Sequence, residues 1–196
     1  MKQGRLVLLI IASSLLSACV GGIWTGANIV YDRHSVYKKI NNYHLFIRVT
    51  NALYPDNALK APGCYLDVTV FNGDVLVVGH LPTPELMQLE RQRISLVRGQ
   101  RRLYNEVTQS DELSSNVQDG WITAKIRSYI FSNDSIDPNS IKILTSDGIV
   151  YLMGEVKPDQ GQQIIQIART VSGVRKVVTL MRYYTYQSKK TIPDKN

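Results

Sequence analysis

No apolar stretch in this sequence is long enough to cross a lipid bilayer as a helix. The apolar run near the start extends only from Leu6 to Leu16, whereas a membrane span needs about 20 residues. No second long apolar stretch follows it. We therefore do not expect a helix to hold this protein in a membrane.

Recognisable catalytic and metal-binding motifs are also missing. No serine-nucleophile elbow, P-loop or HExxH motif occurs, so signatures of hydrolase, nucleotide and zinc-protease chemistry are lacking. The three histidines, His34, His44 and His80, do not have the spacing of metal ligands. We predict that the protein is not an enzyme, holds no metal or cofactor and has no small-molecule substrate.

What the sequence does contain at its start is typical of a secretory signal. Lys2 and Arg5 precede the short apolar run, and small residues follow it. The tetrad at residues 16–19, Leu-Ser-Ala-Cys, resembles the lipobox of bacterial lipoproteins, in which the cysteine is acylated and becomes the first residue. The alternative is an ordinary signal peptide with a chance cysteine. We predict a signal peptide at residues 1–18 and lipidation of Cys19.

The residue after Cys19 bears on localisation. In enterobacterial lipoproteins an aspartate at this place means retention in the inner membrane, whereas this sequence has Val20. The resemblance therefore implies an outer-membrane protein on the periplasmic face, held by lipid at Cys19. Several acyl chains together hold a protein stably, although one alone anchors it only weakly.

The remaining chain is mildly basic. Loss of Lys2 and Arg5 with the signal lowers the formal charge from +7 to +5, which suits an anionic partner such as phospholipid. The cluster of Arg98, Arg101 and Arg102 is also compatible with nucleic acid, but export argues against that partner. A solvated strand edge is the default interpretation of this cluster, and a second anion-binding surface is the alternative.

The second cysteine, Cys64, has no partner within the chain if Cys19 is acylated. It stands beside Tyr65 and Leu66 at the start of a predicted strand. This position favours a buried small hydrophobic residue over a reactive thiol.

Two stretches, residues 66–79 and 141–154, share one pattern of strands, turns and glycines. Each has an alternating strand, an Asn-Gly or Asp-Gly turn, a second strand and a further glycine. Such turns between strands are strong hairpin signals, because they require positive φ. The glycines repeat at an offset of 75 residues, so we predict an internal duplication.

Helical segments surround each predicted hairpin, so that each unit reads helix, strand, strand, helix, strand. The predicted helices cover residues 42–53, 84–97, 116–131 and 158–171, and the third strands cover residues 101–107 and 175–181. Proline begins the second helix of each unit, where its missing N–H costs little. The polar stretch 108–115 joins the two units.

The second unit resembles the BON domain family. Residues 147–156 (DGIVYLMGEV) and 171–177 (VSGVRKV) carry the resemblance. The first unit is more divergent, since residues 98–101 (RGQR) replace the Gly-Val pair usual in the family. The resemblance implies an α+β protein with two tandem BON domains, each an αββαβ unit whose small mixed sheet packs on two helices. We assign a lipidated tether to residues 19–31, the domains to 32–110 and 114–187, and a tail to 188–196.

Outer-membrane lipoproteins with two such units bind anionic phospholipid through the second domain and support envelope integrity, often near the division site. The resemblance implies this non-enzymatic role here. The alternative is a periplasmic adaptor that binds envelope proteins during envelope assembly or regulates cell-wall hydrolases.

The predicted helix at 116–131 has two apolar faces at about 100° per residue. We expect Ile122, Ile126, Tyr129 and Ile130 to face the core. The other face carries aromatic residues flanked by cations, which suits the interface of an anionic bilayer. The predicted phospholipid-binding residues are Trp121, Ala124, Lys125, Arg127, Ser128 and Phe131. The alternative is that Trp121 and Phe131 pack against the first domain.

Overall fold

The computed structural model describes residues 33–111 and 116–185. Cys19, the predicted tether at 19–31 and the predicted tail at 188–196 lie outside this part of the chain. The described residues from Ser35 onward belong to one compact unit. Within the described residues, no helix is sufficiently long and apolar to cross a membrane.

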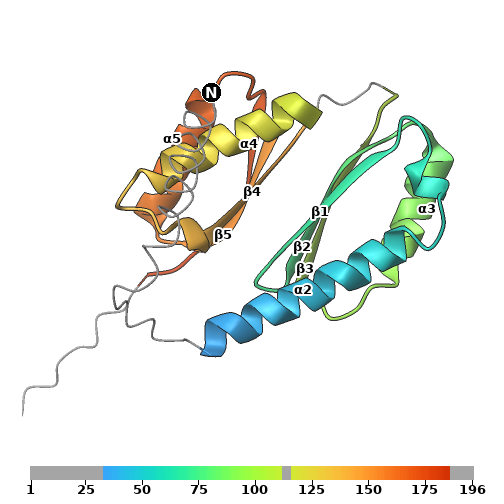
Figure 1. Ribbon diagram of the computed structural model, residues 1–196, viewed down its shortest axis with the longest axis horizontal. Coiled ribbons are helices and arrows are strands. Elements are labelled where there is room, and N and C mark those ends of the chain that lie inside the picture. Colours follow the sequence, from blue (N-terminus) through green and yellow to red (C-terminus); the bar gives the residue numbers. More distant parts are fainter. Residues whose placement is uncertain (1–32, 112–115, 186–196) are drawn as a thin grey trace, which may run out of the picture. The chain divides into compact units, whose positions relative to one another are not determined.

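The first domain consists of two α-helices and three strands (Figure 1). Its elements are α2 (Arg33–Leu53), the short 3-10 helix η1 (Ala58–Lys60), β1 (Tyr65–Phe71), β2 (Asp74–Leu81), α3 (Pro84–Ser95) and β3 (Arg102–Gln109). Helix α3 begins where the sequence predicts, with proline in the first turn. The Thr83 side chain caps it by accepting the Leu86 N–H at 3.3 Å.

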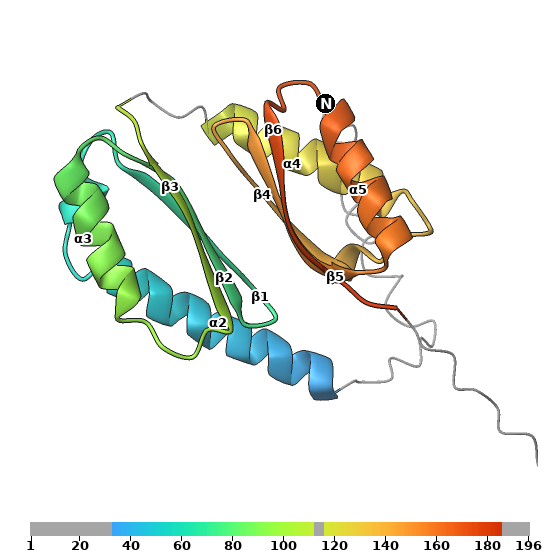
Figure 2. The same ribbon diagram turned by 180° about the vertical axis from the view of Figure 1, so that it is seen from behind.

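The second domain repeats this order. Its elements are α4 (Asn116–Phe131), the 3-10 helix η2 (Pro138–Ser140), β4 (Ile141–Ser146), β5 (Ile149–Val156), α5 (Pro158–Thr170) and β6 (Lys176–Tyr183). In each sheet the second strand is central, antiparallel to the first strand and parallel to the third. The two helices of each domain lie on one face of its sheet (Figure 2). These mixed sheets and helices confirm the predicted α+β class.

The repeated glycines have two structural reasons. At the hairpin turns φ is positive at both central residues, 48° and 82° at Asn72 and Gly73, and 52° and 71° at Asp147 and Gly148. Both turns therefore have the conformation that fits a two-residue hairpin. The later pair is Gly79 and Gly154. A Cβ atom at Gly79 would collide with the carbonyl group of Tyr65 in β1, and a Cβ atom at Gly154 would collide with the carbonyl group of Ser140, just before β4.

Helix α2 is longer than predicted. It begins at Arg33 rather than at residue 42. The buried positions Leu45, Val49 and Leu53 all lie in its second half, whereas Tyr37 and Ile40 in the first half are exposed. Apolar periodicity therefore marks only the half of the helix that packs on the sheet.

Each domain has its own core between helices and sheet. In the first domain, β2 contributes Val75 and Val77 to this core, and in the second domain β5 contributes Val150 and Leu152. The intervening residues of the same strands point to the opposite face. They form a third cluster whose buried members are Leu76, Val78, Tyr151 and Met153. The two sheets therefore contact each other through the faces that their helices leave free.

Candidate functional site

Helix α4 is attached to its own sheet by the buried carboxylate of Asp119. Its two oxygens accept the backbone N–H groups of Asp147 at 2.7 Å and Gly148 at 2.9 Å. Asp119 is 5% exposed and lies in the first turn of α4, where the helix dipole favours a negative charge. The bonds fix the start of α4 over the β4–β5 turn.

In the first domain an uncharged side chain makes the corresponding hydrogen bond. Asn42 on α2 accepts the Gly73 N–H at 3.0 Å, so a polar helix residue again caps the hairpin turn. Sequence reasoning missed both residues. A sequence signal for them existed, because Asn42 precedes Gly73 and Asp119 precedes Gly148 by about 30 residues in both cases.

The inner face of α4 is mostly as predicted. Ile122, Ile126 and Ile130 are at most 1% exposed and belong to the core of the second domain. The expectation for Tyr129 is wrong, since this side chain is 43% exposed. Tyr129 lies at the margin of the inner face, and its ring faces the Lys125 ammonium, with 5.9 Å between Nζ and the ring centroid.

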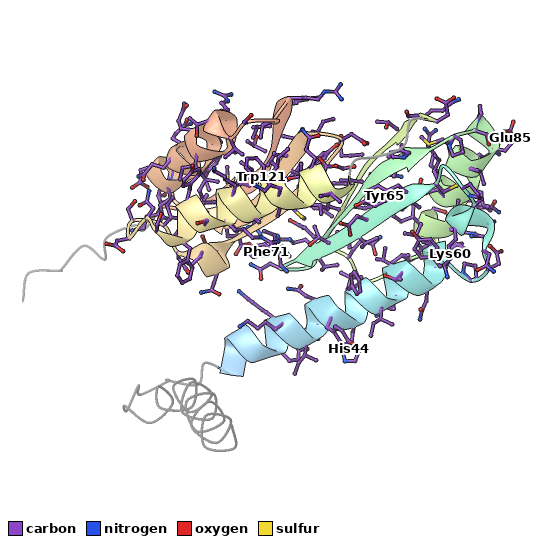
Figure 3. All side chains as sticks on the ribbon, turned by 45° about the horizontal axis from the view of Figure 1, so that its top comes forward. His44, Lys60, Tyr65, Phe71, Glu85 and Trp121 are labelled. Carbon is purple, nitrogen blue, oxygen red and sulfur yellow. The ribbon has the colours of Figure 1, made fainter. Side chains whose placement is uncertain are left out.

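The outer face of α4 presents an apolar stripe. Trp121 is 49% and Phe131 is 79% exposed, and Ala124 and Ser128 between them are exposed as well. Figure 3 shows Trp121 on this helix. Sequence reasoning missed Val117, which is 87% exposed and one helical turn before Trp121. We call Val117, Trp121, Ala124, Ser128 and Phe131 the α4 stripe.

Two cations flank the α4 stripe. The Lys125 Nζ lies 5.0 Å from the centroid of the Trp121 ring, a cation–π geometry. On the other flank, Arg127 donates one N–H to the Ile143 carbonyl at 3.1 Å and is exposed. All six predicted phospholipid-binding residues are therefore exposed and lie on one side of α4.

The contact between the domains leaves the α4 stripe uncovered. The buried apolar residues of this contact come from the sheet faces, and none comes from α4. The alternative that Trp121 and Phe131 pack against the first domain therefore receives no support. The uninterrupted apolar runs at residues 75–78 and 149–153 were the sequence signal of strands buried on both faces.

Polar groups surround the sheet-to-sheet contact. The His80 Nδ1 lies 3.2 Å from an Asp147 carboxylate oxygen, although His80 is 2% exposed. Burial and the nearby carboxylates Asp67, Asp119 and Asp147 raise the pKa of Tyr65 to about 12. Burial, with smaller effects from Glu106 and Asp147, raises the pKa of Tyr151 to about 12 as well.

The three arginines of the predicted solvated cluster are exposed, but one of them is also engaged in ion pairs. Arg101 binds both oxygens of the buried Asp74, at 2.8 and 2.7 Å, and reaches Glu155 of the second domain at 3.2 Å. These bonds raise the Arg101 pKa further, with the hydrogen bond to Asp74 as the main cause. Arg101 thus joins the domains, whereas β3, which follows it, is an edge strand as expected.

Two further predictions concern cysteine and metals. Cys64 is a free, partly buried thiol beside the first core, and burial raises its pKa. This position agrees with a packing role rather than a reactive one. Across residues 33–111 and 116–185, no group of three acidic, histidine or cysteine residues is arranged to hold a metal ion.

Comparison with known proteins shows what this chain is similar to. Residues 118–184, which cover most of α4 to β6, match the BON domain family. The chain is 29% identical to the outer membrane lipoprotein DolP of Haemophilus influenzae, over 91% of this chain and 95% of that protein. It is also 29% identical to a 21 kDa hemolysin of Actinobacillus pleuropneumoniae, over 78% and 79% of the two chains.

These findings confirm the predicted resemblance to BON-domain lipoproteins of the DolP kind. The first domain has the same order of elements, but the family match covers only the second. Among solved structures, the C-terminal domain of CdsD from the type III secretion system of Chlamydia trachomatis matches 72% of this chain and 98% of that one, at 8% identity. Its TM-score of 0.30 is too low to carry an argument.

Proposed function

We propose that this protein is an outer-membrane lipoprotein, anchored at Cys19 on the periplasmic face, whose second domain binds anionic phospholipid and so helps to maintain envelope integrity. The observation that carries the proposal is the exposed α4 stripe between Lys125 and Arg127. A helix in a small domain needs one apolar face for its core, and α4 has a second one. The similarity to DolP supports the location.

The chemistry of the α4 stripe suits the boundary between water and lipid. Indole and phenyl rings settle at the depth of the headgroups, and cations beside them meet the phosphates. Each Lys or Arg near an anionic membrane surface contributes about 1 kcal/mol. Two cations and two rings give weak binding by themselves. An acyl anchor at Cys19 would keep the domain near lipid, so that weak contact becomes effective.

Vesicle flotation tests the proposal. The variant uses residues 19–196 with Cys19→Ser, so that acylation does not hold the chain to the vesicle. We expect this protein to float with vesicles that contain phosphatidylglycerol and not with pure phosphatidylcholine. Trp121→Ala with Phe131→Ala should abolish flotation, because it removes both rings from the α4 stripe.

A matched control separates lipid contact from damage to the fold. Leu96 is 70% exposed and lies beyond the end of α3 in the first domain, so Leu96→Ala removes an exposed apolar group elsewhere. This variant should float like the parent protein, and both variants should melt within a few degrees of it. Unchanged flotation of the Trp121 and Phe131 variant would refute lipid binding by α4.

A protein adaptor is the second candidate function. The exposed apolar side chains of α2 favour it, since Tyr37 is 65% and Ile40 is 49% exposed. An adaptor would keep its membrane location after Trp121→Ala and would lose a co-purifying envelope protein after Tyr37→Ala.

A further inference from the structure

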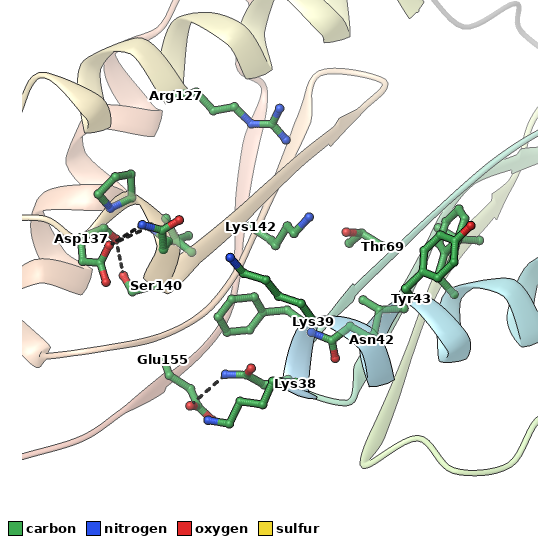
Figure 4. Close-up of a pocket in the computed structure, with 18 of the residues that line it drawn as sticks. Lys38, Lys39, Asn42, Tyr43, Thr69, Arg127, Asp137, Ser140, Lys142 and Glu155 are labelled. Carbon is green, nitrogen blue, oxygen red and sulfur yellow. Dashed lines mark hydrogen bonds between the residues drawn. The ribbon is translucent and has the colours of Figure 1, made fainter. Parts of the chain in front are cut away.

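A groove of about 1110 Å3 lies beside β1 and is lined by both domains. Helix α2 contributes Lys38 and Lys39, β1 contributes Phe71, and the second domain contributes Arg127 and Lys142. Figure 4 shows Lys39, Arg127 and Lys142 pointing toward the same space from α2, α4 and β4. We call this space the α2–β4 groove.

The groove is lined by more cations than acids, since it has four Lys or Arg side chains and two carboxylates. Glu155 pairs with Arg101 at 3.2 Å and with Arg182 at 2.9 Å, and Asp137 accepts the backbone N–H of Asn139 at 2.9 Å. By contrast, no ion pair within residues 33–111 and 116–185 involves the groove's four cations. These are Lys38, Lys39, Arg127 and Lys142. Like charges that share a groove repel, and an anion between them relieves the repulsion.

An apolar hollow adjoins this charged space. The hollow has a volume of about 180 Å3 and is lined by Ile130, Phe131, Ile141 and Ile143, with Arg127 at the boundary. Arg127, Pro138 and Ile141 line both spaces. The hollow thus connects the α2–β4 groove to Phe131, the last residue of the α4 stripe.

We propose that the α2–β4 groove and its hollow bind one anionic phospholipid molecule. The phosphate lies among Lys39, Lys142 and Arg127, and the first part of an acyl chain lies against Phe131 and Ile143. A cationic space that continues into an apolar one fits an anion with an apolar tail better than it fits free phosphate. The inference rests on the proposed function and extends it, since it gives the first domain a part in lipid recognition.

Calorimetry with a soluble lipid tests the groove directly. Residues 19–196 with Cys19→Ser are titrated with dihexanoyl phosphatidylglycerol below its micelle-forming concentration. This chain keeps the whole compact unit that begins at Ser35. We expect saturable binding of one lipid per chain, and weaker binding of glycerophosphoglycerol, which has the headgroup without acyl chains, and of inorganic phosphate.

Two double variants locate the site. Each cation near an anionic headgroup strengthens binding about fivefold, so Lys39→Gln with Lys142→Gln should weaken binding about 25-fold. Arg91→Gln with Lys176→Gln removes the same charge from exposed positions outside the groove and should leave the affinity within about twofold. Thermal melting of both variants confirms that they are folded.

Three results would overturn the proposal. They are no saturable binding of the short-chain lipid, equal binding of inorganic phosphate, and unchanged affinity in the Lys39 and Lys142 variant. Failure of the proposed function gives a different pattern, namely vesicle flotation that survives loss of Trp121 and Phe131. If flotation needs these two rings while the short-chain lipid does not bind, only the groove inference fails.

Discussion

Asp119 offers the sharpest test of how the helix that carries the α4 stripe is held in place. Its carboxylate accepts two backbone N–H groups at the β4–β5 turn, and Asp119→Ala would leave both donors without their partner. The Gly148 N–H is buried and the Asp147 N–H is partly buried. Water can therefore replace the carboxylate at the Asp147 N–H better than at the Gly148 N–H.

The structure gives a magnitude for this substitution. An unsatisfied buried donor costs about 1–3 kcal/mol, and hydrogen bonds to a charged group contribute about 1.5–3 kcal/mol. We therefore expect Asp119→Ala to lower the free energy of unfolding by about 3 kcal/mol. Asn42→Ala removes one neutral bond to Gly73 and should cost about 1 kcal/mol. Asp119→Asn keeps one acceptor and should fall between them.

Urea unfolding followed by Trp121 fluorescence measures these differences, because Trp121 lies two residues from Asp119. Trp24→Phe removes the only other tryptophan. With a urea dependence of about 2 kcal/mol/M, Asp119→Ala should lower the midpoint by about 1.5 M. A midpoint within 0.3 M of the parent, or an Asn42→Ala effect as large as that of Asp119→Ala, would refute the reasoning from paired donors.

Three further predictions concern the sheets. Leu76→Ala removes a fully buried side chain from the sheet-to-sheet contact and should cost about 3 kcal/mol in the same urea assay, whereas the exposed Leu96→Ala should cost less than 0.5 kcal/mol. Tyr65 keeps its proton up to about pH 12 in the folded state but only to about pH 10 when unfolded, so stability should fall as pH rises from about 10 to 12. The urea midpoint should decline less steeply over that range in Tyr65→Phe, and an identical decline would contradict the assigned pKa. Gly154→Ala places a Cβ 2.5 Å from the Ser140 carbonyl oxygen and should lower the melting temperature by several degrees, whereas Gly120→Ala has open space and should not lower it.

Much of the local structure could be predicted from the sequence, since it depends on short-range rules. The Asn-Gly and Asp-Gly turns require positive φ, and the prolines at residues 84 and 158 begin helices, so hairpins and helices are where the sequence predicts them. The same holds for the three isoleucines on the inner face of α4. The α4 stripe and its flanking cations were also predictable, because they lie on one helix and their spacing alone places them together.

Only the tertiary structure decided what covers each surface. The sequence left open whether Trp121 faces the first domain, and the answer depends on the contact of β2 with β5, whose residues are about 75 positions apart. The first half of α2 and the α2–β4 groove were invisible for the same reason. Apolar periodicity reports which residues avoid water, but it does not report which partner shields them. That choice depends on packing between segments distant in the chain, and here the packing buries the sheet faces and leaves the α4 stripe exposed.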